Sequence, residues 1–145
     1  MLRPPGSRIT GWGGVLGATS QRIAAAAPPI AADVLVIAIA LTDERRGVPF
    51  RDTTVNIDKM VKTVNASRVI VAGLAPLDAQ SDEAAKVDGQ FAQLASQRGW
   101  TYTEAAAGVR NGNTYKDSTS SDGISPNAVV AKIIGEALRA AILLR

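Results

Sequence analysis

Apolar and polar positions follow one another along the chain in blocks that predict alternating strands and helices. Two nearly continuous apolar runs, residues 34–40 and 68–73, are rich in β-branched side chains and bounded by turn signals. Runs of this kind are typical of parallel strands that other elements cover on both faces. The pattern therefore predicts a buried parallel sheet built around these two segments.

Helical spacing appears in three further segments, residues 57–64, 81–98 and about 126–144. Residues 52–54 offer caps for the first helix, and Gly99 is expected to end the second. The expected buried faces are, in turn, Ile57, Met60, Val61 and Val64; Val87, Phe91, Leu94 and Ala95; and Val130, Ile133, Ile134, Ala137, Leu138 and Ala141.

The remaining segments complete the alternation with two short strands, a turn, an alanine-rich helix and a long loop. They are residues 8–12 and 100–104, 13–17, 18–27 and 108–123, respectively. The resulting order predicts an α/β fold, a three-layer α/β/α domain with a short parallel sheet and right-handed crossovers. We expect one such domain over residues 10–145, preceded by an N-terminal arm of residues 1–9.

The composition excludes several kinds of chemistry. The 145 residues include no cysteine and no histidine, and 46% of them are hydrophobic. Without cysteine there is no disulfide, thiol nucleophile or Cys-ligated zinc, and without histidine there is no Ser-His mechanism and no His-ligated metal. We therefore expect no metal and no cofactor, in a globular domain stabilised by its apolar core.

The net charge is small and its cations are scattered. Lys and Arg number 16 against 13 Asp and Glu, and Arg45 and Arg46 are the only adjacent cationic pair. Nucleic-acid-binding domains usually carry a clustered basic surface, and the longest apolar run here is too short to span a bilayer. The N-terminus also lacks the apolar stretch of a signal peptide. We expect no nucleic-acid or membrane partner, and a protein made in the cytoplasm.

A glycine cluster near the N-terminus fails both common phosphate-binding patterns. Counting from Gly11 and Gly13, the third glycine of a dinucleotide fingerprint falls on Leu16. Gly17 is followed by Ala18, where a P-loop has lysine. A tight strand-to-helix turn is the simpler interpretation of this cluster.

Three segments, taken in order, resemble the sequence blocks of one hydrolase family. Residues 12–20 (Trp-Gly-Gly-Val-Leu-Gly-Ala-Thr-Ser) resemble an Asn-x-Gly-x-x-Gly block, and residues 40–43 (Ala-Leu-Thr-Asp) resemble a Gly-x-Asn-Asp block. Residues 122–127 (Asp-Gly-Ile-Ser-Pro-Asn) resemble an Asp-Gly-x-His-Pro-Asn block. These are blocks of the SGNH (GDSL-type) hydrolases. The resemblance implies an SGNH-like, flavodoxin-like fold that lacks the family's first strand and helix, because only about ten residues precede the first matching block.

The resemblance implies five family positions in this chain, namely Arg8, Gly14, Thr42, Asp122 and Ser125. Arg8 stands near the place of the family's nucleophilic serine, Ser125 replaces its catalytic histidine, and Thr42 replaces an oxyanion-hole asparagine. Gly14 can still offer a backbone N–H, and Asp122 retains the aspartate of the triad.

These positions lack the general base that hydrolysis by a nucleophilic serine needs. A serine hydroxyl needs a neighbouring group to take its proton at neutral pH, and the chain has no imidazole. Asp122 then has nothing to orient, so we expect no catalytic residue. Structural roles are expected instead, with Ser125 capping the last helix ahead of Pro126 and Asp43 lying in an ordinary solvated loop.

These observations favour a non-catalytic SGNH-like module, a pseudoenzyme that serves in assembly or binding. A structural component of a virus particle, such as a capsid decoration or tail protein, fits this description, and we expect a homo-oligomer or a subunit of a larger assembly. The alternative is a diverged esterase or carbohydrate deacetylase that acts through Asp122 and an unidentified serine. A further alternative is a module that binds a sugar or acyl group in the old cleft near Gly14, Thr42 and Asp122 without cleaving it.

Overall fold

The centre of the fold is a sheet of parallel strands. The computed structural model describes residues 11, 13, 17–39, 41–123 and 127–144. Strands β1 (Val34–Ile37), β2 (Arg68–Ala72) and β3 (Thr101–Thr103) form a three-stranded sheet in the order β1-β2-β3. Both neighbouring pairs are parallel, which confirms the predicted sheet. The arm of residues 1–9 and the expected strand of residues 8–12 fall largely or wholly outside the described residues.

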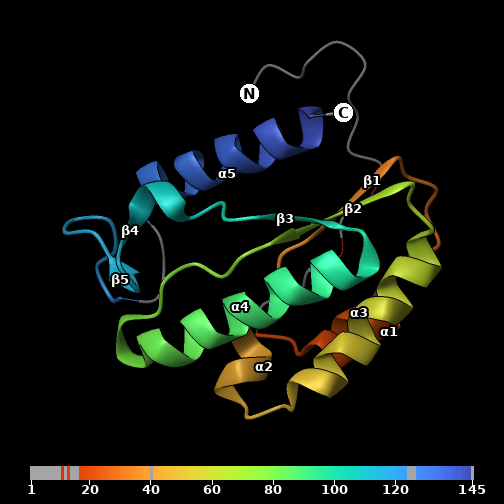
Figure 1. Ribbon diagram of the computed structural model, residues 1–145, viewed down its shortest axis with the longest axis horizontal. Coiled ribbons are helices and arrows are strands. Elements are labelled where there is room, and N and C mark those ends of the chain that lie inside the picture. Colours follow the sequence, from red (N-terminus) through yellow and green to blue (C-terminus); the bar gives the residue numbers. More distant parts are fainter. Residues whose placement is uncertain (1–10, 12, 14–16, 40, 124–126, 145) are drawn as a thin grey trace.

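Helices cover both faces of this sheet and give the predicted three layers. On one face lie α1 (Ser20–Ala26), α3 (Phe50–Val64) and α4 (Ser81–Arg98), and on the other lies α5 (Ala128–Leu143), as Figure 1 shows. A short helix, α2 (Leu41–Arg45), follows the end of β1. The sequence analysis did not predict α2.

The main core lies between the sheet and helices α1, α3 and α4. Phe91 of α4 is buried at its centre, and its ring meets that of Phe50 edge to face at a centroid distance of 5.1 Å. Burying an aromatic side chain of this size stabilises a fold by about 1.5–3 kcal/mol. The buried members of this core are Ile37, Ile57, Met60, Val69, Val71, Leu74, Leu77, Ala84, Val87, Phe91, Leu94 and Ala95. The expected stripe of the second helix is confirmed in full.

The ends of two helices use left-handed backbone conformations. Gly99 follows α4 with φ of 70°, and its N–H donates to the carbonyls of Ala95 and Ser96, which confirms the predicted end. Asn65 closes α3 in the same way, with φ of 52°. The start of α3 differs from expectation, because the helix begins at Phe50 and Thr53 is already inside it.

Helix α5 begins with a side-chain cap, at a position the sequence analysis did not choose. Oδ1 of Asn127 accepts a hydrogen bond from the N–H of Val130 at 3.0 Å. The expectation that Ser125 caps this helix is therefore wrong, since helical structure starts at Ala128 and Asn127 stands directly before it.

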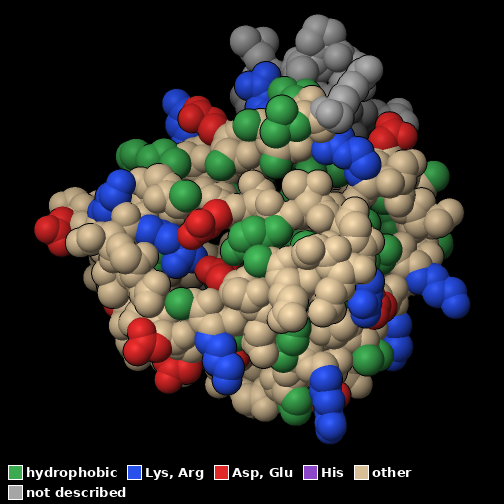
Figure 2. Space-filling model, in the orientation of Figure 1, with side chains coloured by type: hydrophobic (Ala, Val, Ile, Leu, Met, Phe, Trp, Pro, Cys, Tyr) green, Lys and Arg blue, Asp and Glu red, His purple; other side chains and the backbone are tan. Residues whose placement is uncertain are grey.

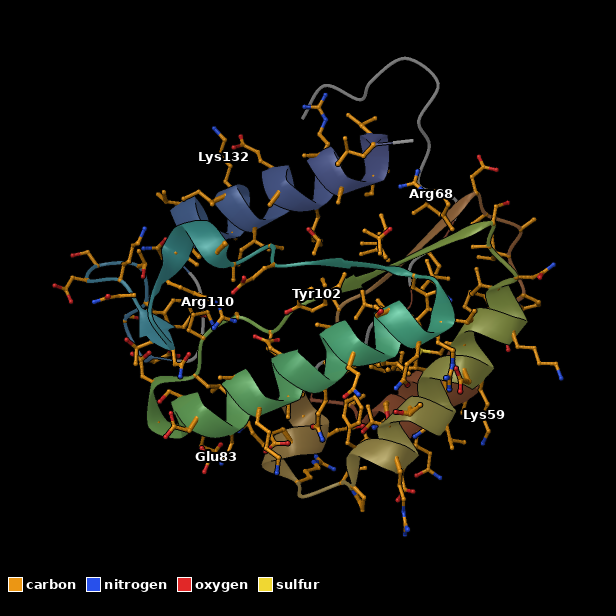
Figure 3. All side chains as sticks on the ribbon, in the orientation of Figure 1. Lys59, Arg68, Glu83, Tyr102, Arg110 and Lys132 are labelled. Carbon is orange, nitrogen blue, oxygen red and sulfur yellow. The ribbon has the colours of Figure 1, made fainter. Side chains whose placement is uncertain are left out.

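Most of the inward face predicted for α5 is covered, with one exception. Val130 and Ala141 are buried and Ile134 is half-buried, whereas Ile133 is exposed and its expected burial is wrong. The end of α5 is tied to the sheet, because the Arg68 guanidinium of β2 donates to the carbonyls of Ala141 and Ile142. Figure 3 shows Arg68 beside this end of the helix.

The segment expected as a long loop contains regular structure in its first half. A 3-10 turn, η2 (Ala107–Val109), leads into a hairpin of β4 (Arg110–Asn111) and β5 (Thr114–Tyr115). Its tight turn includes Gly112, whose φ of 60° favours glycine. The hairpin and η2 pack against α5 in a second, smaller core of Ala106, Val109, Tyr115 and Val130.

The surface shows no concentration of positive charge on the face seen in Figure 2. Lys and Arg side chains are spread over this face and mixed with Asp and Glu. Among the described residues, no helix has the length and apolar character needed to cross a bilayer.

Candidate functional site

The carboxyl end of β1 is organised around a buried carboxylate. Asp43 of α2 is only 2% exposed, so the prediction that it lies in a solvated loop is wrong. Its Oδ1 accepts the backbone N–H of Ser20 at 2.8 Å, and its Oδ2 accepts the hydroxyls of Ser20 and of Thr53, the latter at 2.7 Å. These donors supply the hydrogen bonds that a buried charge requires.

A fourth side chain extends this network to a second position on α3. Nδ2 of Asn56 donates to Oγ of Ser20 at 2.9 Å. The cluster of Ser20, Asp43, Thr53 and Asn56, here called the Asp43 network, therefore joins α1, α2 and α3. Sequence reasoning missed Ser20 and Asn56, and it assigned Thr53 to a helix cap. The partners lie 10 to 36 residues apart, so local patterns could not reveal them.

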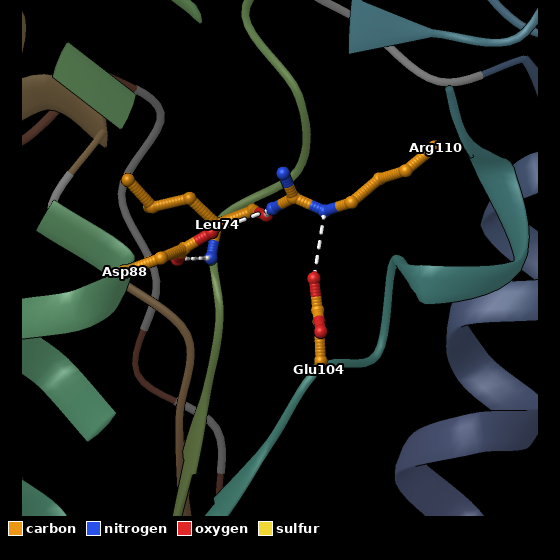
Figure 4. Close-up of polar contacts among 4 residues, drawn as sticks. All are labelled: Leu74, Asp88, Glu104 and Arg110. Atoms are coloured by element: carbon orange, nitrogen blue, oxygen red, sulfur yellow. Dashed lines mark hydrogen bonds and ion pairs between the residues drawn. The ribbon is translucent and has the colours of Figure 1, made fainter. Parts of the chain in front are cut away.

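The loop after β2 is held by a second charged cluster, shown in Figure 4. The N–H of Leu74 donates to Oδ1 of Asp88 at 2.6 Å, and the carbonyl of Leu74 accepts from Nη2 of Arg110 at 2.6 Å. Nη2 also lies 2.6 Å from Oδ2 of Asp88, and Nε of Arg110 lies 3.2 Å from Oε1 of Glu104. This Asp88–Arg110 cluster joins α4, β4 and both loops that follow β2 and β3.

Burial controls the electrostatics of the Asp88–Arg110 cluster. Desolvation raises the pKa of Asp88 above its usual value, although the Leu74 N–H and the Arg110 guanidinium oppose the shift. Burial, with the nearby carboxylates of Asp88 and Glu104, raises the pKa of Tyr102 to about 12. Figure 3 shows Tyr102 between β3 and α4. Both groups therefore hold their protons more tightly than they do in water.

A third contact joins the loop after β2 to the loop before α5. The N–H of Asp78 donates to the carbonyl of Gly123 at 2.9 Å, and Oδ1 of Asp78 accepts the N–H of Tyr115 at 2.9 Å. Gly123 has φ of 68°, and a Cβ there would come within 2.9 Å of Asp78, so both conformation and space require glycine. Burial raises the pKa of Tyr115, and the nearby carboxylates of Asp122 and Asp78 add to this shift, so Asp122 lies close to this contact.

Two of the five predicted family positions fall within the described residues. Thr42 is half-buried in the first turn of α2, next to Asp43. Asp122 is exposed, and its Oδ1 accepts the hydroxyl of Ser120 at 3.1 Å. Arg8, Gly14 and Ser125 lie outside the described residues.

The described part of the chain offers no obvious metal centre. No group of three or more Asp or Glu side chains there could hold a metal ion. The polar groups near the strand ends are instead engaged in the hydrogen bonds and ion pairs above. Their arrangement can hold loops in fixed positions. Thr42 lies next to Asp43, whereas Asp122 lies near Asp78 and Tyr115, and no contact among the described residues joins the two places.

Comparisons with known proteins bear on the fold. No protein-family model and no curated protein matches the sequence. Among solved structures, the chain is similar to a putative acylhydrolase from Bacteroides fragilis, with a TM-score of 0.70 and 18% sequence identity over 87% of this chain and 70% of that chain. The protein therefore has an α/β fold like that acylhydrolase, with a three-stranded parallel sheet flanked by helices. This agrees with the fold implied by the resemblance to the SGNH hydrolases.

Proposed function

We propose that the protein is a binding unit with an acylhydrolase-like fold, which holds an acyl-bearing ligand at the carboxyl end of its sheet. Ligands of open α/β sheets bind at this edge. The observation that carries the proposal is the way charged side chains fix the loops there. The Asp43 network fixes the end of β1, and the Asp88–Arg110 cluster fixes the loop after β2. Loops that are already fixed favour binding, because little conformational entropy is lost when the ligand enters.

Binding without turnover is favoured over hydrolysis by the composition of the chain. Hydrolysis by a serine needs a neighbouring base, and the 145 residues contain no histidine. Asp122 is exposed and accepts a hydrogen bond from the hydroxyl of Ser120. Its carboxylate can orient a polar group of the ligand. The hydrolase alternative requires Asp122 as a catalytic residue. One set of variants therefore tests both binding without turnover and hydrolysis.

The test uses sodium butyrate as an acyl probe of binding and p-nitrophenyl butyrate as a probe of turnover. Replacing Thr42 with Phe is expected to abolish butyrate binding by filling the space beside α2. Thr63→Phe, at an exposed position of α3, is the matched control and is expected to bind normally. Ester turnover that is lost in Asp122→Asn would establish the hydrolase alternative instead. Butyrate binding that survives Thr42→Phe, or no binding at all, contradicts the proposal.

A second candidate function is the assembly role predicted from the sequence, and the surface of α5 favours it. Val129 is 68% exposed and Leu143 49% exposed on this helix, with Leu144 just beyond its end. Figure 2 shows hydrophobic side chains at the surface over α5. A second copy of the chain would remove these side chains from water, and incorporation into a virus particle is one form that such assembly takes.

Light scattering over a range of concentrations tests the assembly role. We expect masses at multiples of 15.1 kDa and a return to the monomer when Val129 and Leu143 are both changed to Glu. Thr63→Glu, on the opposite side of the sheet, is the control. A monomer at every concentration would exclude self-assembly through α5.

A further inference from the structure

An open pocket lies between the start of α1 and helix α3. Its volume is about 320 Å³, and none of its lining residues comes from β1, β2 or β3. A space of that size takes a small organic molecule, or about ten water molecules at ~30 Å³ each. Its main lining residues are Ser20, Gln21, Val48, Asp52, Val55 and Asn56.

The floor of the pocket carries polar groups whose orientation is fixed. Asn56 is 8% exposed and donates one N–H to Ser20, which in turn donates to Asp43. This relay sets the plane of the Asn56 amide. Within the described residues, Oδ1 and the second N–H of Asn56 have no hydrogen-bond partner. Oδ1 is in contact with solvent, because among the described residues the one fully buried side-chain polar atom that makes no hydrogen bond is Nε of Arg110, which forms the ion pair with Glu104. Asn56 lines the pocket, so its amide can accept a hydrogen bond from a ligand there.

The walls and rim differ in character from the floor. Val48 and Val55 give apolar surface, and Val55 is 52% exposed. Gln21 and Asp52 at the rim are exposed, and they add an amide and a carboxylate. Apolar surface beside fixed donors and acceptors is the usual construction of small-molecule sites.

The carboxylates near the pocket disfavour an anionic ligand. The described lining contains Asp52 and no Lys or Arg, and Asp43 accepts a hydrogen bond from Ser20. Arg51 pairs with Asp52 at 3.4 Å, but both side chains are exposed, so the pair offsets the Asp52 charge only in part. An anionic ligand would approach both carboxylates, whereas a hydroxyl group can donate a charge-assisted hydrogen bond to Asp52.

We propose that this pocket binds a neutral, hydroxyl-rich ligand such as a single sugar ring. Hydroxyl groups of the ring pair with the amide of Asn56 and the carboxylate of Asp52, and its C–H face packs on Val55. The pocket shares Ser20 and Asn56 with the Asp43 network, but its described lining includes neither Thr42 nor Asp122, on which the acyl-binding proposal is tested. Two different probes, a sugar and butyrate, therefore distinguish failure of one proposal from failure of the other.

The test follows amide and side-chain signals in the nuclear magnetic resonance spectrum while glucose or xylose is added to the intact chain. We expect shifts at Ser20, Val55 and the side-chain amide of Asn56, and none with inorganic phosphate. Val55→Phe fills the pocket from an exposed position and is expected to weaken sugar binding about tenfold or more, which corresponds to about 1.4 kcal/mol. Thr63→Phe, at an exposed position of the same helix, is the matched control, and it should leave sugar binding unchanged.

Three results would overturn the proposal: no sugar-dependent shift at these residues, equal weakening by Thr63→Phe, or stronger binding of phosphate than of sugar. The butyrate assay with Thr42→Phe reports on the strand ends alone. Butyrate binding that is absent from the unchanged protein or survives Thr42→Phe, with intact sugar binding, identifies a failure of the acyl-binding proposal. Butyrate binding that Thr42→Phe abolishes, without a sugar-dependent shift, identifies a failure of this one.

Discussion

Replacing Asp43 with alanine tests whether the Asp43 network holds three helices together. The carboxylate accepts hydrogen bonds from the N–H and hydroxyl of Ser20 and from the hydroxyl of Thr53, in a position that is 2% exposed. Alanine leaves all three donors buried without an acceptor. Each unsatisfied buried donor costs about 1–3 kcal/mol, and hydroxyl rotation recovers part of this, so we expect a loss of about 3–5 kcal/mol. That is a large share of the stability of a single domain, about 5–15 kcal/mol.

Two further variants separate hydrogen bonding from side-chain shape. Asp43→Asn keeps the shape and one acceptor oxygen, and rotated hydroxyls can accept from its amide, so we expect a loss of about 1–2 kcal/mol. Asp52→Asn changes an exposed carboxylate in the first turn of α3 and is expected to cost about 0.5 kcal/mol or less. The assay is urea unfolding followed by far-ultraviolet circular dichroism, with free energies taken by linear extrapolation. If Asp43→Ala loses no more than Asp52→Asn, the network does not stabilise the fold and the reasoning is refuted.

Three further predictions concern the other contacts. Arg110→Met leaves Asp88 buried without its cation and is expected to lower the free energy of unfolding by about 3 kcal/mol. In a protein that already carries Asp88→Asn, the same change should cost much less, and equal losses in both proteins would contradict the pairing. Tyr102 should ionise at a pKa of about 12 in an ultraviolet titration. Because the folded pKa exceeds the unfolded value, the resulting stability is complete below about pH 10 and is lost as the pH rises to 12, and Tyr102→Phe should remove this loss. Asn127→Ala removes the cap of α5 and should lower the free energy of unfolding by about 1 kcal/mol, and Tm by about 2–4 °C in a thermal melt. A change within experimental error would show that the cap does not stabilise the fold.

The elements whose signals are local could be predicted from the sequence. The β-branched runs became β1 and β2, and the stripe that includes Phe91 became the buried face of α4. Gly99 ended that helix as expected, because its left-handed conformation favours glycine. Each of these features depends on residues that lie within a few positions of one another.

The candidate site depended on contacts between distant residues and was predicted poorly. Asp43 is followed by Glu44, Arg45 and Arg46, a context that favours a solvated loop. It is buried nonetheless, because Ser20 and Thr53 bring donors to it from positions 23 and 10 residues away. Likewise, the sequence held no signal that Arg110 would pair with Asp88 across 22 residues. A charged residue next to other charges can therefore be buried when tertiary contacts supply its partners.

The position of α5 has a consequence for how the chain is synthesised. It is the last described helix, it lies on its own face of the sheet in Figure 1, and its last turn accepts the hydrogen bonds of Arg68 from β2. Domains begin to fold while the ribosome is still adding residues, at about 5–20 per second. Helices α1, α3 and α4 can therefore assemble on the sheet before α5 emerges. During that interval the second face of the nascent sheet is open to water and to chaperones, and synthesis of α5 closes it.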